Sequence, residues 1–268
     1  MKKRNWYLTI GIVLTACMLV FTAVGFFWTP YDPSKMSAAD RYAAPSLTHL
    51  FGCDHMGRDI LSKTLNGAAT TLTIALAVLA VGAVCGLVVG ALCGYYGGPA
   101  DALVMRLCDA IAAFPSVLLA LVVIAVIGPG TYNVIGALGV LFIPSFARLV
   151  RGEFLKYRDR DFVQSARLMG VSGLRIVFVH ILPNIWPTLL SGLTIGFNNA
   201  VLAEASMSYL GIGVSPTDPS LGYMLSEAQG HLFKAPWYTA FPAAVVILLI
   251  LGVGLVGEGI RERMGVER

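Results

Sequence analysis

The sequence predicts an all-α integral membrane protein with six transmembrane helices. The mean hydropathy is +0.76, and only 13% of the 268 residues are charged, whereas a soluble domain carries about 25%. The chain therefore has too few charges to cover a surface that faces water. It also contains several uncharged stretches that reach the roughly 20 residues a helix needs to cross a bilayer, and these stretches place the helices.

The first helix is expected at Tyr7–Trp28, directly after the basic start Met1–Arg4. This uncharged run is longer than the roughly 7–15 residues of a signal peptide's apolar core. It ends in three aromatic residues, Phe26 to Trp28, which are typical of the membrane–water interface. We expect an uncleaved helix that is followed by a polar outer loop at 29–63.

The second helix is expected at Leu72–Tyr96. The next uncharged stretch, Ala110 to Ala147, is too long for a single span. Gly128-Pro129-Gly130 interrupts this stretch, and glycine and proline break regular helices. We therefore expect two helices there, Leu103–Ile127 and Tyr132–Val150.

The last two helices are expected at Ile185–Met207 and Tyr238–Gly257, which leaves an inner loop at 151–184 and an outer loop at 210–237. If the N-terminus is inside, fourteen of the 19 Lys and Arg residues fall in inner segments, and seven of these lie in or beside the inner loop. Because cytoplasmic loops carry the excess of positive charge, both termini are predicted to be cytoplasmic.

The sequence lacks the motifs of the common catalytic and metal sites. It contains no G-x-x-x-x-G-K-[ST] phosphate loop, no H-E-x-x-H and no G-x-S-x-G. Its five cysteines are odd in number and form no C-x-x-C pair, so a disulfide framework or metal cluster is not expected. We predict that the chain is not an enzyme, has no catalytic residue or metal site, binds no cofactor itself and does not bind nucleic acid.

Small and polar residues inside the predicted helices indicate contacts or a pathway. Gly82, Gly86, Gly90 and Gly94 recur at every fourth position, which predicts a close contact with another helix. The fifth predicted helix contains three polar residues, Asn198, Asn199 and Glu204. Such residues either line a pathway or join helices by hydrogen bonds, and both interpretations stay open for these three.

The inner segment Asp161–Asn184 is long for a plain connection. We expect a first short helix that stops at Gly170 and a second, Leu174–Leu182, that ends at Pro183. This hairpin is either a rigid element that transmits force to a partner or an amphipathic hairpin on lipid headgroups.

The same segment resembles the "EAA" loop of ABC-importer permeases, whose pattern is E-A-A-x3-G-x9-I-x-L-P. The spacing matches at every step, from Gln164-Ser165-Ala166 through Gly170 to His180-Ile181-Leu182-Pro183. Gln164, Ser165 and His180 differ from the residues of the pattern. The resemblance implies that the following residues dock against an ATPase subunit: Gln164, Ser165, Ala166, Arg167, Leu168, Met169, Gly170, His180, Leu182 and Pro183.

Two further motifs resemble the dipeptide/oligopeptide/nickel branch of these permeases. Phe51–Asp59 resembles its G-T-D-x-x-G-R-D signature, with Cys53 in the place of Thr, and Ser208–Gly213 resembles S-F-L-G-L-G. Ala235-Pro236-Trp237 and Phe241-Pro242 match the start of the last helix of that branch. The signature residues are Gly52, Asp54, Gly57, Arg58 and Asp59, and we expect Arg58 and Asp59 to form a charge pair that orders the outer loop.

The resemblance implies the type I ABC-importer permease fold in a bacterial cytoplasmic (inner) membrane. It implies a heterodimer with a sister permease, two cytoplasmic ATPases that hold ATP and Mg, and an extracytoplasmic binding protein, with membrane lipids around the helices. We divide the chain into residues 1–66, an anchor helix with its outer loop, and residues 67–268, a five-helix core with a cytoplasmic coupling loop at 151–184.

The resemblance leaves two classes of transported substrate, nickel or a metal chelate and small peptides. The short chain favours nickel or a metal chelate slightly over small peptides, and in a nickel importer His49, His55 and His231 of the outer loops would be candidate ligands. The alternative to a permease subunit is a secondary transporter or channel that acts alone, and such a protein would transport without an ATPase.

Overall fold

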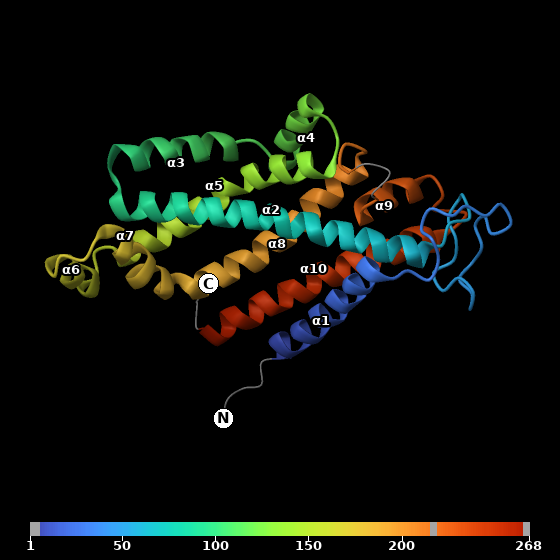
Figure 1. The fold of residues 1–268 in the computed structure, drawn as a ribbon, viewed down its shortest axis with the longest axis horizontal. Coiled ribbons are helices and arrows are strands. Elements are labelled where there is room, and N and C mark those ends of the chain that lie inside the picture. Colours follow the sequence, from blue (N-terminus) through green and yellow to red (C-terminus); the bar gives the residue numbers. More distant parts are fainter. Residues whose placement is uncertain (1–5, 215–218, 265–268) are drawn as a thin grey trace.

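The described residues of the computed structural model, 6–214 and 219–264, form an elongated bundle of helices (Figure 1). Five helices are long and apolar enough to cross a membrane, and a sixth span results if one bent pair of helices counts as one. The basic residues Lys2, Lys3, Arg4 and Arg268, which support the predicted orientation, lie outside the described residues. The prediction of an all-α protein with about six spans is confirmed.

Five long helices form the body of the bundle, the short helices α3 and α4 lie beside it, and the other short helices lie at its ends (Figure 1). The elements are α1 Trp6–Phe27, α2 Ile60–Tyr96, α3 Gly98–Ala112, α4 Ser116–Ile127, α5 Thr131–Tyr157, α6 Asp161–Leu168, α7 Gly173–Arg175, the π-helix η1 Ile176–Ile181, the 3-10 helix η2 Leu182–Ile185, α8 Trp186–Tyr209, α9 Leu221–Gln229 and α10 Pro236–Met264. We call residues 29–59 and 219–235, at one end of the bundle, the crown, and residues 161–185, at the opposite end, the docking segment.

Helix α2 begins at Ile60, earlier than the predicted start at Leu72. Asp59 explains this early start, because its carboxylate accepts a hydrogen bond from the backbone N–H of Ser62 (2.8 Å) and so caps the helix. The 37 residues of α2 span about 55 Å, which exceeds the roughly 30 Å of a bilayer core. The predicted division of the chain at residue 66 therefore falls inside a continuous helix and stays a prediction.

The single helix predicted at Leu103–Ile127 is wrong. Helices α3 and α4 are bent by 86° at the break between them. Pro115 directly precedes α4, and the residue before a proline is disfavoured in helical conformation. Helix α3 instead lies along α5, where Arg151 makes a two-pronged ion pair with Asp101 (2.7 and 2.9 Å).

Pro183 does not end a helix, contrary to the prediction. The chain stays helical from Gly173 to Tyr209. A proline inside an α-helix removes one hydrogen bond and clashes with the preceding turn. Here the π-helical turn at Ile176–Ile181 and the 3-10 turn at Leu182–Ile185 change the local winding around Pro183, and the chain runs on into α8.

The predicted glycine contact on α2 is confirmed. All four glycines face α5, and a Cβ added at Gly86 would lie 2.5 Å from the Cβ of Phe146. At Gly90 the added Cβ would lie 2.8 Å from the Cβ of Val150. Only glycine therefore allows the two backbones to approach this closely.

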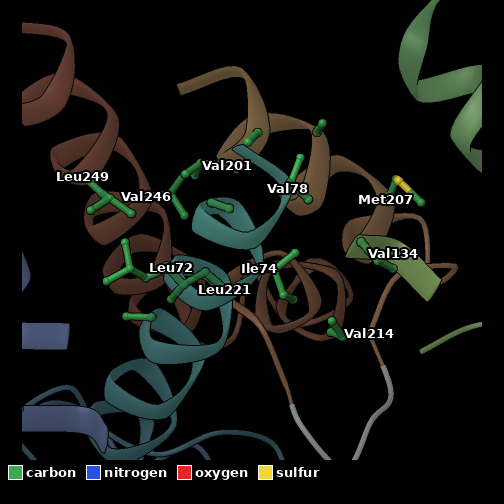
Figure 2. Close-up of a cluster of buried hydrophobic side chains, with 14 of the residues drawn as sticks. Leu72, Ile74, Val78, Val134, Val201, Met207, Val214, Leu221, Val246 and Leu249 are labelled. Atoms are coloured by element: carbon green, nitrogen blue, oxygen red, sulfur yellow. The ribbon is translucent and has the colours of Figure 1, made fainter. Parts of the chain in front are cut away.

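The main core lies where α2, α5, α8, α9 and α10 meet, with α4 at its edge (Figure 2). It is built mainly from aliphatic side chains, among them Leu72, Ile74 and Val78 from α2 and Val246 and Leu249 from α10. A second, smaller core joins the docking segment to α2 and α5. The two cores fix the crown and the docking segment to the same long helices.

Candidate functional site

An open groove of ≈ 580 Å³ runs between α4, α5 and α8. The face of α8 toward it follows helical spacing, with Gly192, Gly196, Asn199, Ala203 and Ser206 one turn apart. The groove is mainly apolar, and its polar side chains within the described residues are hydroxyls and one amide, with no charged group among them. Such a surface can hydrogen-bond a polar solute without holding it by charge.

The three polar residues predicted in the fifth helix take different places. Asn199 is exposed and lines the groove. Asn198 is half-buried and faces α10, because a Cβ added at Gly254 would lie 3.1 Å from its Nδ2 atom. Glu204 is fully buried. Of the three pathway candidates, the structure therefore brings only Asn199 to the groove.

Glu204 instead joins α8 to the segment that leads into α9. Its Oε1 atom accepts a hydrogen bond from the Ser208 hydroxyl (2.7 Å), and the hydroxyls of Thr71 and Ser220 also face this carboxyl group. Oε2 meets no hydrogen bond of good geometry among the described residues. The Thr71 hydroxyl in turn accepts from the backbone N–H of Leu221 (3.1 Å). This network fixes the start of α9 against α2 and α8.

At the other end of the bundle, α6 presents one exposed face. Leu168 and Met169 are 90% and 76% exposed, and Gln164 and Ser165 are exposed beside them. Ala166 differs, because it is 2% exposed and packs in the smaller core of this chain. In the first part of the predicted docking set, Ala166 packs against the long helices. Gln164, Ser165, Leu168 and Met169 form the exposed face that a partner can contact.

Gly170 ends α6 in the left-handed conformation (φ +78°). The backbone N–H groups of Val171 and Gly170 bond to the carbonyls of Ala166 (3.1 Å) and Arg167 (3.0 Å), which is the Schellman pattern. The Arg167 guanidinium lies 4.9 Å from the centre of the Tyr95 ring of α2. These contacts hold α6 rigidly against the long helices.

The second part of the predicted docking set lies in the π and 3-10 turns. His180 and Leu182 are half-buried and Pro183 is exposed. The His180 carbonyl accepts a hydrogen bond from the Asn184 side chain (2.6 Å). These residues shape the return of the chain to α8, and a direct contact with a partner remains a prediction for them.

A largely buried network of four charged side chains joins the crown to the start of α2. Lys63 of α2 bonds to Asp54 (3.0 Å) and Glu227 (2.7 Å). Arg58 bonds to the same two carboxylates (2.7 and 2.9 Å), and the Tyr238 hydroxyl donates to Glu227 (3.1 Å). The network joins the loop 29–59, α2, α9 and α10, and its two positive charges balance its two negative charges.

The pKa values of the carboxyls reflect this pairing. Burial acts to raise the pKa of Asp54, but Lys63 and the hydrogen bonds around the group outweigh it and lower the pKa below its ordinary 3.8. For Glu227, burial is likewise outweighed by Lys63 and Arg58, so its pKa lies below its ordinary 4.5. Both groups are therefore ionised at neutral pH.

The signature residues sit in this crown, but the predicted Arg58–Asp59 pair is wrong. Asp59 caps α2 and bonds to His49 Nδ1 (2.9 Å), while Arg58 bonds to Asp54 and Glu227. Adjacent residues point in different directions here because Asp59 starts the helix. Gly52 and Gly57 both have positive φ (72° and 77°), which explains glycine at these positions.

The outer-loop histidines do not form a metal site in the described residues. His55 and His231 stack on each other with ring centres 4.6 Å apart, and burial lowers the pKa of His55. His49 lies apart from this pair and contacts Asp59. The three side chains therefore serve as packing and hydrogen-bonding groups within the crown.

Comparison with known proteins decides the family. The model of the family described as "Binding-protein-dependent transport system inner membrane component" matches residues 86–265. The chain belongs to this family. It is a multi-pass protein of the bacterial inner membrane and an ABC-importer permease of the dipeptide/oligopeptide branch, as the sequence motifs indicated.

Two relatives and two solved structures extend this result. The chain is 40% identical over 265 residues to the glutathione transport system permease protein GsiD of Escherichia coli O6:K15:H31 (strain 536 / UPEC) and to that of Shigella sonnei (strain Ss046), which covers 98% of this chain and 88% of each relative. Two inward facing structures of the MetNI methionine ABC transporter match with TM-scores of 0.61 and 0.62, 22% identity, and coverage of 76% of this chain and 96% of theirs. The match confirms the type I permease fold. The predicted nickel or metal-chelate substrate finds no support.

Sequence reasoning missed three members of the crown network, Lys63, Glu227 and Tyr238. Lys63 is the single lysine near the start of a long apolar run, and a buried lysine there needs a carboxylate partner. That signal could have singled out Lys63. It could not have identified Glu227, which lies 164 residues away in the sequence.

Proposed function

We propose that this chain forms one half of the translocation pathway of an ATP-driven importer for glutathione or other small peptides. The open groove between α4, α5 and α8 carries the proposal. Its volume of ≈ 580 Å³ lies within the 300–1,000 Å³ usual for small-molecule sites. Because the groove is open along one side, a second subunit is needed to close it into a pathway.

The lining of the groove favours a peptide over a metal ion. Asn199, Ser145 and Ser206 offer hydrogen bonds that suit peptide amides, whereas imidazole is the ligand that suits a nickel ion. Uncharged polar groups also allow a zwitterionic peptide to leave the site again, which transport requires. The similarity to glutathione permeases points to the same class of substrate.

The two ends of the bundle then have different partners. The docking segment contacts a cytoplasmic ATPase of an ATPase pair, the crown faces the extracytoplasmic side, and both termini are cytoplasmic. A sister permease closes the groove. ATP and Mg bind in the ATPase partners, and this chain binds no cofactor itself. A secondary transporter or channel that acts alone is not favoured, because the exposed face of α6 has no role in it.

Uptake in cells tests the proposal. We expect cells that express this chain with its sister permease, ATPases and binding protein to accumulate labelled glutathione or a labelled dipeptide, and not labelled nickel. Cells that lack only this chain should show no uptake. Accumulation of nickel alone would contradict the peptide assignment, and uptake by cells that express this chain without any ATPase would support the stand-alone alternative.

Replacement of Gly170 by Asp tests the docking segment. We expect this variant to insert into the membrane but to lose transport and co-purification with the ATPase. The residue has positive φ, where a side chain costs about 1–2 kcal/mol, and no described residue of this chain lies within 4 Å of an added Cβ. The added carboxylate would thus contact the ATPase partner and not other residues of this chain.

Gly211 provides a matched control for this experiment. It has nearly the same φ (+77°), and no described residue lies within 4 Å of its added Cβ either, but it lies at the crown end. Gly211→Asp imposes an equal backbone strain and should leave ATPase binding intact. Equal loss of ATPase binding in both variants, or normal transport by Gly170→Asp, would show that Gly170 does not contact the ATPase.

A further inference from the structure

Tyr42 in the crown is held in a strained conformation. It is the one non-glycine residue with positive φ (57°) within 6–214 and 219–264, a conformation that is uncommon for bulky residues. Its backbone N–H bonds to the Asp54 carbonyl (3.0 Å) and its hydroxyl bonds to His231 Nδ1 (3.2 Å). Strain of this kind persists where the surroundings fix it, and it concentrates at functional positions.

Two positive side chains lie over the Tyr42 ring. The Arg41 guanidinium carbon is 6.0 Å and the Lys234 ammonium is 5.9 Å from the ring centre. Arg41 is also held by a hydrogen bond from its Nε to the His55 carbonyl (2.8 Å). The two cations come from loops that are far apart in sequence, and the ring of Tyr42 brings them to one place.

Both cations are exposed, and neither pairs with a carboxylate in the part of the chain that the structure describes. The nearby acids Asp54 and Glu227 are already paired with Arg58 and Lys63 in the buried network. Asp40, which precedes Arg41 in sequence, accepts a hydrogen bond from the Ser37 hydroxyl (2.6 Å). Arg41 and Lys234 are therefore two exposed cations without an ion-pair partner among the described residues. A partner that offers carboxylates would form ion pairs with these two cations.

An apolar side chain lies next to this positive surface. Phe233 directly precedes Lys234 and is fully exposed (101%). Aromatic and arginine side chains dominate the binding energy of protein interfaces, where they fill pockets on the partner. An exposed phenylalanine beside two unpaired cations is thus typical of a docking surface, and it fits a partner with an apolar pocket beside acidic groups.

We propose that Arg41, Tyr42, Phe233 and Lys234 form the surface on which the extracytoplasmic binding protein docks, through carboxylates of that protein. This inference rests on the proposed function, which places the crown on the extracytoplasmic side. The family description names a binding protein as the component on which transport depends, and the docking segment for the ATPase lies at the opposite end of the bundle (Figure 1).

Charge reversal at both cations tests this surface. The complete complex, with Arg41→Glu and Lys234→Glu in this chain, is reconstituted in vesicles of phosphatidylcholine alone, and ATPase activity is measured against binding-protein concentration. We expect the concentration for half-maximal stimulation to rise about tenfold or more, since like charges then oppose each other. In the unaltered complex this concentration should rise with salt, and in the variant the salt dependence should weaken or reverse. The basal ATPase rate should not change.

Lys35→Glu is the matched control, because Lys35 is also exposed in the loop 29–59 but does not contact Tyr42. It should shift the half-maximal concentration much less than the double variant. Phe233→Ala should raise the concentration without altering its salt dependence. An equal shift by Lys35→Glu would overturn the proposal, because it would show unspecific attraction.

Other outcomes separate the remaining partners. Failure of the double variant to assemble with the sister permease would assign the surface to that subunit and overturn the proposal. A shift that occurs only in vesicles with anionic lipid would assign it to lipid headgroups and also overturn it. If the unaltered complex is not stimulated by any binding protein, the proposed function itself fails and this surface with it.

Discussion

Replacement of Lys63 by Met is expected to destabilise the protein by about 3–5 kcal/mol, the usual effect of removing one partner from a buried ion pair. Lys63 is 2% exposed and bonds to both Asp54 and Glu227. Without it, the buried Asp54 and the partly buried Glu227 share the single positive charge of Arg58. The methionine has a similar length, so the change removes the charge and leaves most of the packing.

The pH dependence of this variant provides a second readout. Asp54 and Glu227 have lowered pKa values in the folded protein, so their contribution to stability is present above their ordinary values of 3.8 and 4.5 and is lost as the pH falls through the lowered values. Lys63 is a main cause of the lowering. The stability difference between variant and unaltered protein should therefore be largest near pH 7 and should narrow as the pH falls below about 4.

Thermal or denaturant unfolding of the purified protein in detergent measures both effects. Lys156→Met is the matched control, because Lys156 pairs with Glu153 (2.6 Å) but is 65% exposed. An exposed pair contributes only about 0–1 kcal/mol. Equal destabilisation by the two substitutions, or a difference for Lys63→Met that does not depend on pH, would contradict the idea that the buried network holds the crown together.

The membrane spans and the glycine contact could be predicted from sequence because each depends on local features. An uncharged stretch is apolar wherever it lies, and glycines four residues apart always share one face of a helix. The bend at Pro115 was missed because proline also occurs inside intact helices, as at Pro144 in α5. Local sequence does not show which of the two prolines has neighbours that accommodate it.

The crown and the groove depend on contacts between distant parts of the chain. Arg58 was assigned to its neighbour Asp59, whereas its partner Glu227 lies 169 residues away. Asn198 and Asn199 are adjacent and chemically identical, and only the packing of α8 decides that Asn199 faces the groove. The motif at 51–59 could thus be recognised from sequence, but not the network that it builds with α9 and α10.

Gly90→Ala is expected to destabilise the protein by about 1–3 kcal/mol, the usual effect of overpacking. The added methyl group would lie 2.8 Å from the Cβ of Val150 and against the Ala147 carbonyl of α5. Neither is the far end of a flexible side chain, so α2 and α5 must move apart. Because these two helices carry both cores, the separation would also loosen the docking segment.

Gly152→Ala provides a control in which the sign should be opposite. Gly152 lies inside α5, and its added Cβ would have no neighbour within 4 Å in the part of the chain that the structure describes. Alanine favours a helix over glycine by about 0.5–1 kcal/mol, so this variant should be slightly more stable in the same unfolding measurement. If Gly90→Ala were also stabilising, the space between α2 and α5 would have to be larger than the structure shows, and the glycines would serve flexibility rather than close packing.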